Sequence, residues 1–182
     1  TFRQRDMRMR MSCAPISTTS QNIQAVLAFL LLGICYLIIC LGLAFIFNGK
    51  ELLNASHLIY YIINAALCMG LSLALAFFIG MIAKNASVIT SITNVLSLGL
   101  CFLGGVFVPL DFLSESITKV SQLLPVYWYE EILLILVQFP ELSAANQASI
   151  NRGLLIQLLY IAALFCIGLV IGRVKSQDTA NV

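Results

Sequence analysis

Four long apolar segments, none of which contains Asp, Glu, Lys or Arg, constrain this chain more than any other feature. They cover residues 25–47, 58–83, 86–110 and 153–172. At ~1.5 Å of rise per residue, each is long enough to cross a hydrocarbon layer of ~30 Å as a helix. Lipid offers no partners to backbone amides, so a segment that crosses it must pair them internally. The sequence therefore predicts an all-α integral membrane protein with four transmembrane helices.

The basic residues predict how the chain is oriented. Hydrophobic residues make up 60% of the chain and charged residues only 10%, against roughly 25% charged residues in soluble domains. With four spans both termini lie on one side of the membrane, and that side holds most of the cations: Arg3, Arg5, Arg8, Arg10, Lys84, Arg173 and Lys175. Because cytoplasmic loops are enriched in Lys and Arg, we expect a multi-pass protein of the plasma or inner membrane with both termini cytoplasmic.

Three polar regions flank the spans. Residues 1–24 form a basic cytoplasmic segment, and residues 173–182 form a cytoplasmic tail. Residues 111–151 form a long outer region with two short helical candidates, roughly residues 112–124 and 126–138, on the two sides of a proline. Neither candidate is long enough to span the bilayer. We therefore predict a hairpin of interfacial or re-entrant helices there.

The third span carries a stripe of small, mildly polar residues. Their steps of three or four place them on one face of a helix. The stripe consists of Ser87, Ser91, Asn94, Ser97 and Cys101. One interpretation is a seam between packed helices, because small and weakly polar residues let helices approach in lipid. The other is the wall of a translocation path, and both hold where helices of two subunits meet around a path.

The chain lacks the residues that catalysis or metal binding would need. Its single histidine, His57, has no Cys, Asp or Glu at ligand spacing, so no metal or other cofactor is expected. It contains no G-x-x-x-x-G-K-S/T loop for nucleotide hydrolysis. Its spans hold no acid that could carry a coupling ion. We therefore expect a transport subunit rather than an enzyme, driven by a partner.

The basic segment before the first span combines cations, apolar side chains and a proline. The residues in question are Arg8, Arg10, Pro15, Ile16 and Ser17. One interpretation is that the cations set the topology and attract anionic lipid. The other is that a short amphipathic element docks in a groove of a soluble partner.

Three segments in this order resemble the permease subunit of type-2 ATP-binding-cassette (ABC) exporters. They are an Arg-rich stretch leading to Ala-Pro-Ile-Ser at 14–17, Leu-Gly-Gly-Val-Phe-Val-Pro-Leu at 103–110, and Leu-Pro-Val-Tyr-Trp-Tyr-Glu-Glu-Ile-Leu at 124–133. The resemblance implies a six-span permease that works as a dimer with two nucleotide-binding subunits. The spans seen here would be its last four, and the chain, which begins at Thr1, would be part of a longer protein.

The resemblance also implies roles for particular residues. The coupling region that receives the movement of the ATPase would contain Arg8, Arg10, Pro15, Ile16 and Ser17. The outer gate would contain Gly104, Gly105, Pro109, Pro125, Tyr127, Trp128 and Glu130. The implied partners are an ABC nucleotide-binding subunit, a second permease copy or homologue, and the lipid bilayer, with no nucleic acid. The implied cargo is a drug-, peptide-, lipid- or polysaccharide-like molecule.

Two other classes of protein fit four apolar spans. A membrane scaffold or assembly subunit would use its small-residue seams and have no path for a substrate. A self-contained four-helix channel would need no partner, although the long outer hairpin is surplus for a simple pore. Aqueous reagents that reach Ser91, Asn94 and Ser97 would argue against the scaffold.

Overall fold

The computed structural model describes residues 18–54, 57–83, 85–109, 112, 114–139 and 142–180. Within them the regular structure is entirely helical. The helices are α2 (Thr18–Asn54), α3 (Leu58–Ile82), α4 (Ala86–Leu103), α5 (Glu115–Ser121), α6 (Pro125–Gln138) and α7 (Ala144–Ala180). Four of them, α2, α3, α4 and α7, contain a segment long and apolar enough to cross a membrane. The predicted all-α membrane fold with four spans is therefore confirmed.

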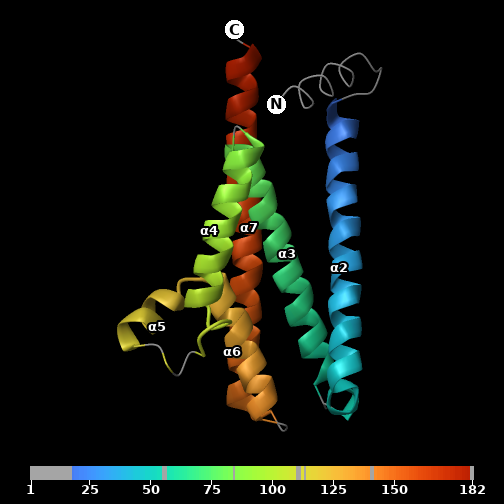
Figure 1. Ribbon diagram of the computed structural model, residues 1–182, viewed down its shortest axis with the longest axis vertical. Helices are drawn as coiled ribbons and strands as arrows, with labels where there is room; N and C mark the ends of the chain where they lie inside the picture. The colour runs from blue at the N-terminus through green and yellow to red at the C-terminus, as the bar shows by residue number, and fades with distance from the viewer. Residues whose placement is uncertain are drawn as a thin grey trace.

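The helices have two distinct ends (Figure 1). The α5–α6 end holds both short helices together with the beginnings of α3 and α7 and the last turns of α2 and α4. The opposite end holds the α3–α4 connection and the C-terminal part of α7. Helices α3 and α7 lie against each other, with α6 packed on both and α2 contacting α3 at the side.

Several helix boundaries differ from the apolar ranges. Helices α2 and α7 extend beyond their ranges at both ends, so that residues 48–54 and 173–180 are helical as well. Helix α4 ends at Leu103 rather than near residue 110, because Gly104 caps it and Gly105 then takes a left-handed φ of 93°. Helix α7 begins at Ala144 rather than near residue 153. Its start is capped by Ser143, whose Oγ accepts a hydrogen bond from the backbone N–H of Asn146 at 3.3 Å.

Small residues bring α3 and α7 together. A Cβ placed on Gly70 of α3 would lie 3.2 Å from Ile161 Cδ1, and one placed on Gly168 of α7 would lie 2.8 Å from Phe77 Cε1. Ala74, one step of four beyond Gly70, is fully buried. Small residues at steps of four, such as Gly70 and Ala74, allow helix backbones to approach closely in lipid.

The largest buried apolar cluster of the described residues lies at the α5–α6 end. It consists of Ile132 and Leu136 of α6 with Ile150 of α7. Here too a glycine sets the distance, because a Cβ on Gly153 would lie 2.9 Å from Ile132 Cδ1. Helix α6 is therefore held tightly against the first turns of α7.

Candidate functional site

The end of α4 meets the beginning of α6 at two glycines. Gly104 and Gly105 are both buried. A Cβ on Gly104 would lie 2.6 Å from Val126 Cγ1 and 2.6 Å from the carbonyl oxygen of Leu100. Contacts this short are sterically forbidden, so only glycine lets α4 and α6 approach as closely as they do. Pro125, the first residue of α6, is buried beside this junction.

Helices α5 and α6 meet at an angle of 107° with a break of only a few residues. The break falls at Pro125, where the sequence predicts it, because proline lacks the N–H that a continuing helix would need. Two side chains fix the turn between them. Trp128 Nε1 donates a hydrogen bond to the carbonyl of Gln122 at 2.9 Å, and the Tyr160 hydroxyl of α7 donates one to the carbonyl of Leu123.

The structure brings most of the predicted gate residues together, but not all of them. Tyr127 is buried on α6 directly after Val126, and its ring contacts that of Trp128 edge-on, with centroids 5.5 Å apart. Glu130 is half-buried on the same helix. Pro109, by contrast, is exposed in the bent segment that follows α4.

A buried polar network joins α3, α6 and α7 near this junction. Gln157 Nε2 donates a hydrogen bond to Asn64 Oδ1 at 2.9 Å, and Asn64 Nδ2 donates one to the carbonyl of Tyr129 at 3.1 Å. Both amide side chains are fully buried. Asn64 and Gln157 are strongly polar residues within apolar spans, but their 93-residue separation in the sequence gives no sign that they pair.

A polar pocket of about 230 Å³ lies beside the network, between α6 and α7. It is lined by Gln122, Tyr127, Trp128, Glu131, Ser149 and Arg152. Burial raises the pKa of the Glu131 carboxyl, and the nearby Arg152 guanidinium opposes that shift. Sequence reasoning did not select Glu131 or Arg152, because they are far apart in the chain and each sits among ordinary interfacial residues.

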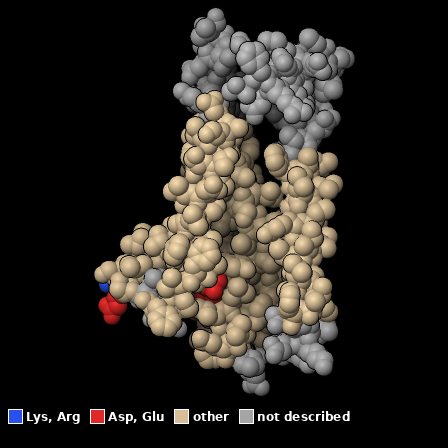
Figure 2. Space-filling model, in the orientation of Figure 1, with Lys and Arg blue, Asp and Glu red and all other residues tan. Residues whose placement is uncertain are grey.

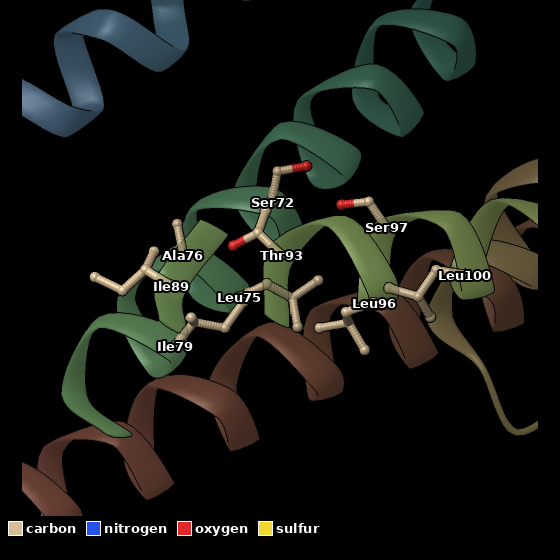
Figure 3. A pocket seen from close by; sticks show the side chains of 9 residues that line it. All are labelled: Ser72, Leu75, Ala76, Ile79, Ile89, Thr93, Leu96, Ser97 and Leu100. Atoms are coloured by element: carbon tan, nitrogen blue, oxygen red, sulfur yellow. The ribbon is translucent and has the colours of Figure 1, made fainter. Parts of the chain in front are cut away.

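A second hollow, a groove of about 250 Å³, lies between α3 and α4. Ser72 of α3 and Thr93 and Ser97 of α4 line it with hydroxyl groups, and the rest of its lining is aliphatic (Figure 3). Ser97 is the one residue of the predicted stripe in this lining. Ser87, Ser91 and Asn94 are exposed, and Cys101 is half-buried. Most of the stripe therefore faces away from the other described helices.

The charged side chains of the described residues are gathered in one region of the visible surface. On the face drawn in Figure 2, the acidic and basic side chains of the described residues gather at the α5–α6 end, and the other described residues on that face are uncharged. The predicted coupling residues Arg8, Arg10, Pro15, Ile16 and Ser17 lie outside the described residues.

These features define a multi-pass membrane protein with a short, bent helix pair whose second helix packs on α3 and α7. Comparison with protein families identifies it further. Residues 1–137 match the model of the ABC-2 type transporter family, which is a membrane domain of transporters. The chain belongs to the ABC-2 type transporter family, and the resemblance in its sequence motifs is thereby confirmed. No curated protein and no solved structure gave a significant match.

Proposed function

We propose that the chain is the membrane-spanning permease subunit of an ATP-driven exporter, and that the α5–α6 end is its outer gate. The observation that carries this proposal is the glycine junction, where α4 ends directly against the first turn of a helix pair bent by 107°. Family membership supplies the class of transporter. The distribution of Lys and Arg favours cytoplasmic termini and so puts the α5–α6 end on the outer side, whereas export as the direction of transport comes only from the resemblance to exporters.

The helix pair is suited to gating because few contacts hold it to α4. Its break is fixed by Trp128 and by Tyr160 of α7, so α5 and α6 follow α7. The closest approach of α4 to α6 among the described contacts is at Gly104, and the residues that follow it form turns and bends rather than helix. A shift of α4 against α7 would therefore open this junction while each helix stays intact.

The energy would come from a nucleotide-binding subunit, because the sequence has no loop for ATP hydrolysis. This is the kind of partner that membership of the family leads us to expect. The basic segment with Arg8, Arg10, Pro15, Ile16 and Ser17 is the proposed contact, and its cations would favour an acidic groove on that partner.

A second permease copy or homologue would face α4. No residue of α4 is buried in the described part of the chain, although this helix is long enough to span the membrane. The exposed Ser87, Ser91 and Asn94 would then line a path between two subunits. The mixture of hydroxyl and aliphatic groups in the adjoining α3–α4 groove fits an amphipathic cargo, such as a lipid-like or drug-like molecule.

Thiol labelling with a membrane-impermeant reagent tests this proposal. In the assembled transporter without native reactive cysteines, Ser91→Cys, Asn94→Cys and Ser97→Cys should be labelled, with a rate that changes when the ATPase partner binds ATP. Ile92→Cys is the matched control, because Ile92 is also exposed but lies on another face of α4. If all three stripe positions resist the reagent as Ile92→Cys does, a scaffold without a path replaces the permease.

A further inference from the structure

The pocket between α6 and α7 has the chemistry of a binding site that the transport path does not use. It faces the turn between α5 and α6, whereas the groove and the stripe lie on α3 and α4. Its volume of about 230 Å³ is below the ~300–1,000 Å³ typical of sites for drug-sized ligands. The pocket therefore suits a small polar group rather than a whole cargo molecule.

The two charged residues of the pocket have unused hydrogen-bonding capacity. Glu131 Oε2 is shielded from solvent and has no hydrogen-bond partner in the part of the chain that the structure describes. Among the described residues, the Arg152 guanidinium makes no hydrogen bond, and it lies 5.6 Å from the centre of the Trp128 ring. Leaving a shielded carboxylate oxygen unpaired is costly, so a ligand that donates a hydrogen bond to Glu131 would be stabilised.

The charges also select the ligand. A bare anion would be attracted by Arg152 but repelled by Glu131. A bare cation would be attracted by Glu131 but repelled by Arg152. A zwitterion satisfies both, with an ammonium group that donates to the carboxylate and a phosphate that accepts from the planar guanidinium fork. The aromatic rings of Tyr127 and Trp128 beside them are the residue types that lie at the level of lipid headgroups.

We infer that this pocket binds a phosphoethanolamine group, a primary amine joined to a phosphate ester, as found in the headgroup of ethanolamine phospholipids. Glu131 accepts hydrogen bonds from the amine, and Arg152 donates to the phosphate. Choline phospholipids carry the same charges but have no N–H, so they cannot satisfy Glu131. Glycerol phospholipids lack the amine altogether. The inference does not rest on the proposed transport function, so a failure of one proposal would leave the other standing.

Trp128 offers a direct readout, because it is the only tryptophan of the chain and it lines the pocket. The purified full chain in lipid-free detergent is titrated with short-chain phosphatidylethanolamine, phosphatidylcholine and phosphatidylglycerol while Trp128 fluorescence is recorded. Saturable binding of the ethanolamine lipid is expected, at least about tenfold tighter than that of the other two, from the value of a hydrogen bond to a charged group. Equal binding of all three lipids would overturn the inference.

Substitutions assign the binding to the two residues. Glu131→Gln and Arg152→Gln should each weaken binding by about tenfold or more, and Arg152→Lys should restore part of it because the charge remains. Glu115→Gln and Lys119→Gln are matched controls, since both residues are exposed on α5 outside the pocket, and they should bind as the parent does. Thermal unfolding verifies that each variant is folded. Unchanged affinity in folded Glu131→Gln and Arg152→Gln would refute the site.

A last titration identifies the source of the group. Free phosphoethanolamine should compete with the lipid but bind more weakly, because the acyl chains add contact with the apolar surface. Equal affinity of the free molecule would still support the pocket chemistry but would assign it to a soluble ligand. Absence of competition even at saturating free phosphoethanolamine would contradict recognition of the headgroup.

Discussion

Helices α3 and α7 differ sharply from α2 and α4, although all four are apolar enough to cross a membrane. The first pair buries Asn64, Ala74, Ile150, Gln157 and Gly168. Of the described side chains of α2 and α4, only Gly33 is buried. Because lipid tails are as apolar as leucine, hydrophobicity does not drive helices together in a bilayer. Glycines and paired amides, rather than apolar content, therefore decide which spans form the centre of this molecule.

The contrast can be tested most strongly at Gly104, where the end of the peripheral helix α4 meets α6. Gly104→Ala places a Cβ 2.6 Å from Val126 Cγ1 and from the Leu100 carbonyl, so we expect a loss of ~1–3 kcal/mol in stability and slower export. Thermal unfolding in detergent measures the first effect. Gly99→Ala is the control, because nothing lies within 4 Å of that position, and it should be neutral or stabilising. Equal effects of the two variants would mean that Gly104 does not set the distance between α4 and α6.

The next largest effect should come from the paired amides. Asn64→Leu leaves the Gln157 amide N–H without its partner and removes the second hydrogen bond to the Tyr129 carbonyl, which costs ~1–2 kcal/mol in a membrane protein. Asn94→Leu removes an exposed amide from α4 and should change stability little. A double-mutant cycle of Asn64→Leu with Gln157→Leu should reveal coupling between the two sites. Strictly additive losses would mean that the network adds nothing beyond its separate members.

A smaller effect is expected from glycines within the spans. Gly168→Ala directs a Cβ to 2.8 Å from the Phe77 ring, and because a side chain shifts more easily than backbone we expect a loss of ~1 kcal/mol. Gly42→Ala on α2 meets nothing within 4 Å and should gain up to ~1 kcal/mol in helix stability. Opposite signs in the two unfolding curves would sharpen the distinction between central and peripheral helices. The same sign in both would break it.

The weakest effect should be a pH dependence that arises at Glu131. Its pKa is raised above the ordinary value of 4.5 in the folded protein, so the folded state binds the proton more tightly than the unfolded state. Stability is therefore expected to fall as pH rises from about 4.5 through the folded pKa. Glu131→Gln should flatten the curve in this window, and Arg152→Gln should steepen it, because Arg152 opposes the shift. A curve of stability against pH that neither substitution alters would exclude the Glu131 carboxyl as the cause of the pH dependence.

Much of the fold follows from local sequence. The four uncharged segments must be helical in lipid. A proline such as Pro125 interrupts a helix when it lies in the helix interior. Hydropathy does not locate the start of α7 at Ala144, because it marks only the apolar part of a helix. The helix continues outside the hydrocarbon layer through polar residues such as Asn151 and Arg152. A cap at Ser143 was the available signal.

The site was less predictable, because it depends on contacts between distant parts of the chain. The junction at Gly104 could be suspected from the paired glycines, but its partner Val126 is set by the packing of α6. The pairing of Asn64 with Gln157 needs the register of α3 against α7, which small-residue spacing suggests but does not fix. The stripe shows the reverse: its periodicity predicts a shared face, yet Ser97 is the only one of its residues that lines the α3–α4 groove.

Helix α7 is 37 residues long and contains no proline. Its length of ~55 Å exceeds the ~30 Å hydrocarbon thickness, so it reaches well beyond the bilayer as one uninterrupted rod. Ile150 and Arg152, which lie beside α6, are in the part of that rod toward its first residue. A rotation of about 5° about its middle would swing each tip by about 2–3 Å, enough to break a hydrogen bond. A force applied at the C-terminal end of α7 would therefore be transmitted through the helix itself to the first turns, against which α6 packs, without a chain of intermediate contacts.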